Sequence, residues 1–311
     1  MANCDNLFRE FNERIKLSET KKESLRTTRD SLREKIRGKF KDKSYDVKFS
    51  WQGSFAMNTI ITPKDNDYDI DDGIYIQTDS KPEESTVTLH SWIVEAAEKH
   101  TNQKPKDKDP CVRVYFADDH HVDLALYYLK KSDEHPQLAH KRDGWIVSDP
   151  KEFMDWFNAH RDINGQLKRI VRYFKAWADN LRGDMPNGLI FTVLAANNMA
   201  PNERDDIAFL ETMKRIQSLL SLSFACYRPT TPREDLFAGY SETRKNYFLD
   251  RLTSFIQSGA QALEEVNQKD ACPKWKRHFG ERFPCDMAED KLDSAKSFES
   301  PAFIRSDARS A

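Results

Sequence analysis

Hydrophobic positions in the first half of the chain follow two spacings. Over residues 5–40 the apolar side chains recur three or four positions apart, which is typical of one long amphipathic helix. Later segments alternate apolar and polar residues, as half-buried strands do, with polar turns between them. We expect a strand over residues 44–55, an acid-bearing strand over 69–76, a helix over 86–100, and paired strands over 112–116 and 122–128.

Helical spacing takes over after Pro150. We expect helices that begin at Pro150 and then cover residues 164–177, 188–199, 205–224 and 241–268. Strands followed by helices are typical of the α+β class, and a chain of 311 residues allows about two domains. We therefore place one domain over residues 1–150, a helical one over 151–290, and a flexible, Ser- and Ala-rich tail over 291–311.

Two carboxylates share one face of the acid-bearing strand. Successive strand side chains point to opposite sides, so Asp69 and Asp71 lie together while Ile70 and Ile74 face the other way. The isoleucine face suits a core, which leaves the carboxylates directed at a cleft. Two oxygen ligands this close can bind Mg²⁺, usually together with substrate phosphates.

A turn and a third acid complete this constellation. Gly53 and Ser54 precede the acids and offer backbone amides and a hydroxyl to phosphates. Asp123 falls on the face of its strand opposite Val122 and Leu124. Three carboxylates on two adjacent strands could hold two Mg²⁺ ions for an in-line displacement at phosphorus. The combination indicates a nucleoside triphosphate site.

Each piece also has an ordinary structural explanation. An isolated Asp-x-Asp is most often a solvated strand end, and we expect Asp118–Asp119 to be such a turn. The turn, the shared face and the third acid together favour a metal site. Asp72 falls on the apolar side of its strand, where we expect a buried or strand-edge carboxylate held by backbone amides rather than a metal ligand.

The helix predicted over residues 164–177 carries cations beside its apolar stripe. Arg172 and Lys175 lie on one side of it and could reach a triphosphate across the cleft, offsetting charge in the transition state. A solvated helix face has the same pattern. We assign Lys168 and Arg169 to such a face.

Composition limits the classes of function. The net charge of −2 argues against broad nucleic-acid binding through bulk charge. No apolar stretch approaches the length of a membrane span, and the polar N-terminus is unlike a secretory signal. We expect a cytoplasmic protein with no membrane partner.

The five cysteines are scattered along the chain. Their odd number and spacing argue against a disulfide framework, so we expect free thiols. Cys272, His278 and Cys285 could share a zinc ion, but their spacing matches no standard ligand pattern and no fourth ligand is evident.

These motifs resemble a known family. They are similar to those of the DNA-polymerase-β-like nucleotidyltransferases and, among these, of the bacterial cGAS/DncV-like enzymes (CD-NTases) of anti-phage CBASS signalling. The resemblance runs from about residue 45 to 285. It rests on the Gln52-Gly-Ser54 turn, the Asp69-Ile-Asp-Asp-Gly strand, Asp123, an oligoadenylate-synthetase-like helix Arg172-Tyr-Phe-Lys175-Ala-Trp177, and a closing motif over residues 275–284.

The resemblance implies a bilobal fold. A polymerase-β-like core with a mixed β-sheet would be joined to a helical, oligoadenylate-synthetase-like C-terminal lobe, and the N-terminal helix would run as a spine along both. Asp69, Asp71 and Asp123 would be the catalytic ligands of two Mg²⁺ ions, for which Mn²⁺ could substitute. The groups implied to contact the triphosphate are Gln52, Gly53, Ser54, Arg172 and Lys175.

The implied activity is condensation of ATP, GTP or both into a cyclic di- or trinucleotide messenger, with release of pyrophosphate. That messenger would activate a downstream effector, and residues 305–311 could be conjugated by an E1/E2-like partner. The sequence shows neither a zinc ribbon nor a strongly basic surface pattern, so we expect no activation by duplex DNA.

Two alternatives stay open at this point. One is a linear nucleotidyltransferase that modifies RNA, a protein or a small molecule. The other is an inactive relative that serves as a nucleotide sensor or scaffold, against which the presence of all three acids argues. The bases used cannot be read from the sequence: Tyr127, Phe191 and Tyr227 are candidates for base stacking, but such aromatics also suit a core.

Overall fold

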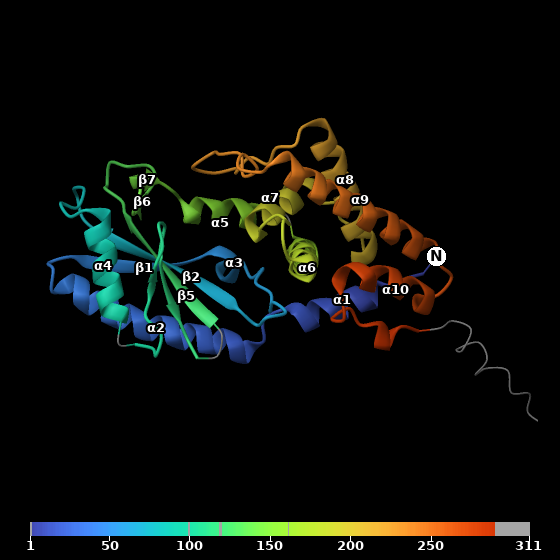
Figure 1. The fold of residues 1–311 in the computed structure, drawn as a ribbon, viewed down its shortest axis with the longest axis horizontal. Helices are drawn as coiled ribbons and strands as arrows, with labels where there is room; N and C mark the ends of the chain where they lie inside the picture. Colours follow the sequence, from blue (N-terminus) through green and yellow to red (C-terminus); the bar gives the residue numbers. More distant parts are fainter. Residues whose placement is uncertain (1, 99, 118–119, 161, 290–311) are drawn as a thin grey trace, which may run out of the picture.

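The computed structural model describes residues 2–98, 100–117, 120–160 and 162–289. The tail predicted over 291–311, its conjugation segment and the Asp118–Asp119 turn therefore lie outside the described residues. Within the described part, a mixed sheet is followed by a helical region (Figure 1).

The sheet has the strand order β1-β2-β5-β4-β3, with β6 paired to β5 and β7. Strands β2 and β5 run parallel, whereas β1 pairs with β2 and β4 with β5 in antiparallel fashion. The pairing predicted for residues 112–116 and 122–128 is therefore confirmed. The strands are β1 (Asp46–Gln52), β2 (Tyr68–Gln77), β3 (Lys106–Asp107), β4 (Val112–Tyr115), β5 (His120–Tyr128), β6 (Gln137–His140) and β7 (Gly144–Val147).

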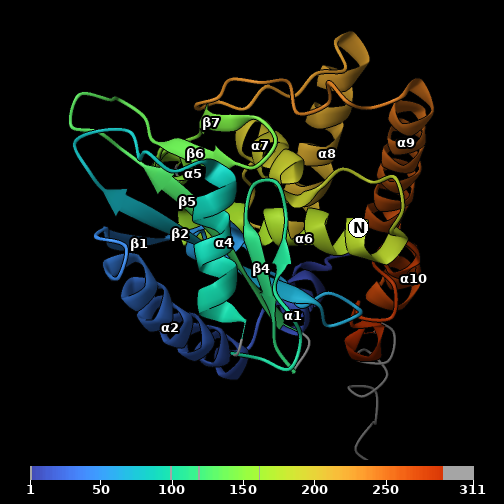
Figure 2. The same cartoon turned by 60° about the vertical axis from the view of Figure 1, so that its left-hand side comes forward.

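Helices line the sheet and build the second half of the molecule. They are α1 (Asp5–Ile15), α2 (Glu19–Lys41), α3 (Gly53–Ala56), α4 (Thr86–Ala97), α5 (Pro150–Ala159), α6 (Gln166–Leu181), α7 (Gly188–Asn198), α8 (Asp205–Leu222), α9 (Glu242–Glu264) and α10 (Gln268–Phe279), with short 3₁₀ turns at Ile163–Gly165 and Cys285–Met287. Helices α2 and α4 contact each other and the sheet (Figure 2). Helix α5 leads from the sheet to the helical part.

The apolar side chains form two separate cores. One joins the sheet to α2 and α4, through residues such as Ile70, Leu124 and Leu32. The other lies among α5–α10 and includes Phe8 and Phe11 of α1. The two N-terminal helices thus belong to different cores.

The prediction of one helix over residues 5–40 is therefore wrong. The chain leaves helical geometry at Lys16, which forms a β-bridge with Ile61, and α2 restarts after Ser18, whose hydroxyl accepts from the Lys21 amide. Serine is a favourable N-cap because its oxygen satisfies a free amide of the first turn. Helix spacing alone did not reveal the break, since both halves keep the same amphipathic pattern.

The helix predicted over 241–268 is also shorter than expected. It ends at Glu264, and α10 begins after Asn267, whose side chain accepts from the Asp270 amide. The predicted Gly-Ser turn is the start of the short helix α3.

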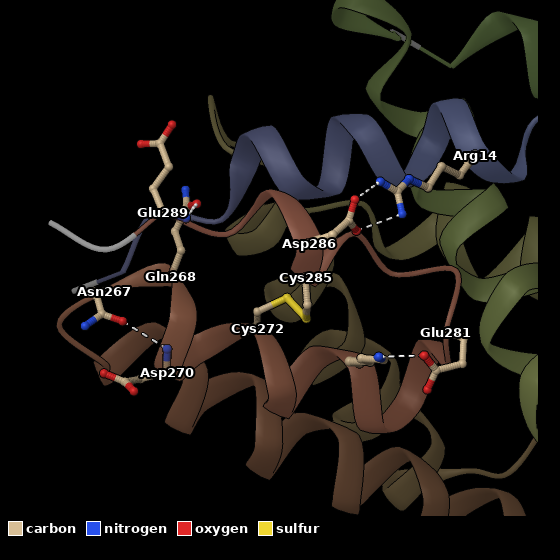
Figure 3. The surroundings of a disulfide bond; sticks show 10 residues. Arg14, Asn267, Gln268, Asp270, Cys272, Glu281, Cys285, Asp286 and Glu289 are labelled. Atoms are coloured by element: carbon tan, nitrogen blue, oxygen red, sulfur yellow. Dashed lines mark hydrogen bonds and ion pairs between the residues drawn. A yellow bond between two sulfur atoms is a disulfide. The ribbon is translucent and has the colours of Figure 1, made fainter. Parts of the chain in front are cut away.

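The prediction of five free thiols is wrong for two cysteines. Cys272 and Cys285 form a disulfide, with their Cα atoms 5.6 Å apart (Figure 3). The chain reverses at Gly280 after α10 and returns past its own helix, which brings the two sulfurs together. Neither is then available as a zinc thiolate, and His278 Nε2 instead hydrogen-bonds Ser258 Oγ. The three other cysteines are free and buried.

Within the described ranges, none of the helices combines the length and apolar character needed to cross a bilayer.

Candidate functional site

A cleft of about 630 Å³ lies between the sheet core and the helical part. Its lining combines the start of α3, the strand β2, the helix α6 and the first residues of α7. The predicted site residues that line it are Gln52, Gly53, Ser54, Asp69, Asp71 and Lys175.

The acids gather because β2 and β5 run parallel in a fixed register. Asp71 pairs with Asp123 across the two strands, and Asp69 pairs with His121. One ligand atom from each of Asp69, His121 and Asp123 lies within 4.8 Å of the others. Since alternate residues share a face, the register places all three acids on the cleft side of the sheet.

Charge is crowded at these positions. Burial, together with the neighbouring carboxylates Asp69 and Asp123, raises the pKa of Asp71 to about 8. Burial also raises the pKa of Asp69, with Asp123 adding to the effect and His121 opposing it. Carboxylates that repel one another in a poorly solvated site are stabilised by a cation. Oxygen-rich donors of this kind suit Mg²⁺ or Mn²⁺, so the residues present fit such an ion.

Arg113 is a site residue that sequence reasoning missed. Its Nε and Nη2 each donate to one oxygen of Asp123, both at 2.7 Å. The signal was available, because the antiparallel pairing of the two predicted strands sets Arg113 opposite Asp123. The third acid is thus held by a bidentate ion pair on the side away from β2.

His121 is a second residue that was missed. Its Nδ1 lies 2.9 Å from an oxygen of Asp67, and its Nε2 lies 3.8 Å from Asp69. The side chain is buried beside the carboxylates, where it can orient Asp69 or add a nitrogen ligand.

Gly53 allows the start of α3 to approach the acids. Its φ is +63°, and a Cβ built there would lie 1.8 Å from Oδ2 of Asp71. Only glycine fits this position, since a side chain would both strain the backbone and collide with the carboxylate. Ser54 follows in the same turn and lines the cleft.

The side-chain amide of Gln52 is held by hydrogen bonds with two tyrosines. Its Nε2 donates to the Tyr75 hydroxyl at 3.1 Å, and the Tyr127 hydroxyl donates to its Oε1 at 3.3 Å. The two tyrosine rings stack with centroids 4.9 Å apart. The side-chain amide is therefore engaged within the protein, although the residue lines the cleft.

The structure separates the two predicted cations of α6. Lys175 lines the cleft, and its Nζ donates to the carbonyl and hydroxyl of Thr59 at 3.1 and 3.2 Å. Burial lowers its pKa to about 8, against the opposing charge of Asp69. Arg172 does not line the cleft; it donates to Asn12 Oδ1 at 2.8 Å and to the Asn58 carbonyl at 2.5 Å.

Neighbouring residues of α6 and β2 turn away from the cleft. Arg169 is not on a solvated face, because it is buried in an ion pair with Asp205. Asp72 is fully buried as predicted, but it is held by the guanidinium of Arg33, with Nε at 2.7 Å, rather than by backbone amides. Periodicity revealed its burial but could not reveal a partner on the helix α2.

The three stacking candidates fall in different places. Tyr127 and Phe191 line the cleft, and Phe191 is also part of the helical core, stacked on Phe174. Tyr227 is exposed and lies outside the cleft lining, but its neighbour Arg228 is part of that lining.

The sequence of this chain is similar to the sequences of known proteins. Residues 47–127 match the family model of the nucleotidyltransferase domain of DncV-like cyclic GMP-AMP synthases. A cyclic GMP-AMP synthase of Escherichia albertii is 31% identical over 233 residues, which cover 68% of this chain and 52% of that protein. A cyclic AMP-AMP-AMP synthase of Acinetobacter sp. is 24% identical over 161 residues, 49% of this chain and 47% of that protein.

The fold also matches a solved structure. The crystal structure of Vibrio cholerae DncV cyclic AMP-GMP synthase in complex with nonhydrolyzable GTP superposes with a TM-score of 0.80 at 20% identity, covering 91% of this chain and 97% of that chain. This likeness confirms the predicted α+β fold with a mixed-sheet core and a helical C-terminal part. The chain spans about half the length of the two curated relatives.

Proposed function

Because the chain belongs to the DncV-like nucleotidyltransferase family, we propose that it condenses nucleoside triphosphates into a cyclic oligonucleotide and releases pyrophosphate. The observation that carries this proposal is the meeting of Asp69, Asp71 and Asp123 beside a cleft whose opposite side holds Lys175. Carboxylates for metal ions and a cation for phosphates are the two requirements of phosphoryl transfer catalysed by positioning and charge.

In this mechanism Asp69, Asp71 and Asp123 would hold two Mg²⁺ ions. Bound there, such ions would lower the pKa of the attacking hydroxyl and stabilise the leaving pyrophosphate. The chain's own residues do the positioning. The backbone at Gly53 and the Ser54 hydroxyl bind the triphosphate, and Lys175 offsets its charge from α6. Arg113 keeps the carboxylate of Asp123 oriented.

The substrates proposed are ATP, GTP or both. The named relatives are synthases of cyclic GMP-AMP and cyclic AMP-AMP-AMP, and the aligned DncV structure holds a GTP analogue. A cleft of about 630 Å³ has room for nucleotide-sized ligands. The product, a cyclic di- or trinucleotide, would then activate an effector in anti-phage signalling.

The first test is pyrophosphate release from ATP plus GTP with Mg²⁺. We expect the rate to fall by roughly a hundredfold or more when Asp69→Asn and Asp71→Asn are combined, because the metal ligands are lost. Asp79→Asn, which changes an exposed aspartate just beyond β2, is the matched control and should leave the rate unchanged. Equal rates in the wild type and the double variant would contradict the proposal.

A further inference from the structure

One wall of the cleft is a short connection between α3 and β2. This wall segment, residues 58–64, contributes Ile60, Ile61 and Pro63 to the lining. It belongs to no regular element apart from the bridge of Ile61 with Lys16. Ile60 packs in the sheet core and Ile61 in the helical core, and the carbonyls on either side of them are held by side chains of the helical part.

Three cationic side chains of the helical part hold this wall segment by its carbonyls. Arg172 donates to the Asn58 carbonyl at 2.5 Å, and Lys175 donates to that of Thr59 at 3.1 Å. Arg282, beyond α10, donates from Nη1 to the carbonyl of Thr62 at 2.8 Å. Hydrogen bonds from charged donors are roughly twice as strong as neutral ones, so together they form a clamp between the two halves of the molecule.

Arg172 and Lys175 belong to α6, and Arg282 joins the wall to α6 from outside that helix. Its Nη2 donates to Asp179 Oδ2 at 2.6 Å and to the Ala176 carbonyl at 3.3 Å. The same oxygen of Asp179 accepts from the Lys64 amide at 3.0 Å. A planar guanidinium can serve several acceptors in fixed directions, which a lysine ammonium cannot do equally well.

The segment that carries Arg282 is itself tethered. Residues 280–288, here called the strap, turn back along α10, and Phe283 is buried against Phe8 and Phe11. The Cys272–Cys285 disulfide ties the strap to α10, and Asp286 accepts two hydrogen bonds from Arg14 of α1 (Figure 3). The Arg14 pair is partly exposed and adds little stability, so the covalent bond is the firmer anchor.

We propose that Arg282 is a positioning residue for nucleotide binding, and that the disulfide-tethered strap holds it in place. Arg282 fixes the wall segment relative to Lys175 and to the strand that carries Asp69 and Asp71. It does not itself line the cleft. The effect on nucleotides rests on the proposed function, whereas the effect on the wall does not.

The test combines hydrogen exchange with kinetics on the whole chain. In Arg282→Gln, we expect amide exchange over residues 58–64 to quicken by at least about tenfold, while β5 exchanges as in the wild type. KM for ATP and GTP should rise about tenfold, with kcat changed less than about threefold. Arg282→Lys should change the exchange rate and KM less than Arg282→Gln does. Cys285→Ser should raise the exchange rate and KM as well, but by less than Arg282→Gln. Arg277→Gln, at an exposed position of α10, is the matched control.

Three results would overturn the proposal: unchanged exchange over residues 58–64 in Arg282→Gln, exchange that rises equally in β5, or quickened exchange without a change in KM. The second would show a general loss of stability rather than positioning. If the wild type neither binds nor turns over nucleotides, the proposed function fails separately, and the exchange data still decide whether Arg282 holds the wall.

Discussion

At position 53 the backbone has a φ of +63° and passes within contact distance of Asp71. Two separate constraints therefore require glycine here: the backbone conformation and the space taken by the carboxylate. Gly53→Ala should lower the rate of pyrophosphate release by roughly a hundredfold or more, because the methyl group displaces the carboxylate of Asp71. The positive φ alone should cost about 1–2 kcal/mol of unfolding free energy.

Gly144→Ala separates these two effects. Gly144 has a φ of +74°, and nothing lies within 4 Å of a Cβ built there. The Gly144→Ala variant should lose a similar amount of unfolding free energy in urea and keep its activity. Equal activity in both variants would contradict the close approach of Gly53 to Asp71.

His278 should make stability depend on pH. Burial, followed by the charges of Arg277 and Arg251, lowers its pKa from 6.5 to about 4. The unfolded chain therefore takes up a proton near pH 6.5, whereas the folded chain does not. The contribution of neutral His278 to the unfolding free energy is therefore fully present above pH 6.5 and is lost as the pH falls toward 4. The loss should be on the order of 2–3 kcal/mol.

The measurement is urea unfolding at pH 7 and pH 5 of the wild type and of His278→Gln. At pH 7 the variant should have a lower unfolding free energy than the wild type, because it loses the hydrogen bond of the ring to Ser258 and its stacking on Phe255. Between pH 7 and pH 5 its unfolding free energy should fall less than that of the wild type. Parallel pH dependences would refute the assignment.

Residue-scale prediction succeeded where a single strand carried the information. Side-chain alternation placed Asp69 and Asp71 on one face because they belong to the same element. It missed Arg113 and the Arg33 partner of Asp72, which lie on other elements. Arg172 was expected at a triphosphate, and its location at the Asn58 carbonyl depends on how α6 is placed against the wall segment.

At the scale of elements, the N-terminal pair of helices shows why periodicity was insufficient. Both α1 and α2 have one apolar stripe, but α1 buries it in the helical core and α2 in the sheet core. A break at Lys16–Ser18 is needed for two helices to serve two cores. Such a break follows from tertiary contacts, whereas the strands and most helices could be located from local spacing.

The strap gives an element-scale prediction. Non-reduced, denatured protein should contain three reactive thiols of five, because Cys272 and Cys285 are bonded. The cysteines are 13 residues apart, and closing a loop of about 15 residues stabilises by about 3 kcal/mol in the chain-entropy model. A dithiol reductant, which is itself oxidised as the bond is reduced to two thiols, should lower the unfolding free energy by roughly that amount.

The Cys272→Ser, Cys285→Ser double variant is the control for this prediction. It should be less stable than the oxidised wild type and should not respond to the reductant. Five reactive thiols in the non-reduced wild type would contradict the bond.

At the scale of the whole molecule, the cleft exists because two cores meet across a few connecting segments. The acids come from the sheet core, Lys175 comes from α6, and the wall segment is held by cations of the helical part. The sequence could predict that Asp69, Asp71 and Lys175 lie at one cleft and that a sheet precedes helices. The relative placement of the halves, and hence the separation of Lys175 from Arg172, required the three-dimensional fold.

The most direct test of this account is the product itself. The purified chain would be incubated with all four labelled nucleoside triphosphates and Mg²⁺, then treated with phosphatase and analysed by chromatography and mass spectrometry. We predict a phosphatase-resistant product with the mass of a cyclic di- or trinucleotide, absent when Asp69→Asn and Asp71→Asn are combined. A product that phosphatase degrades, or a resistant product that persists in the double variant, would contradict the account.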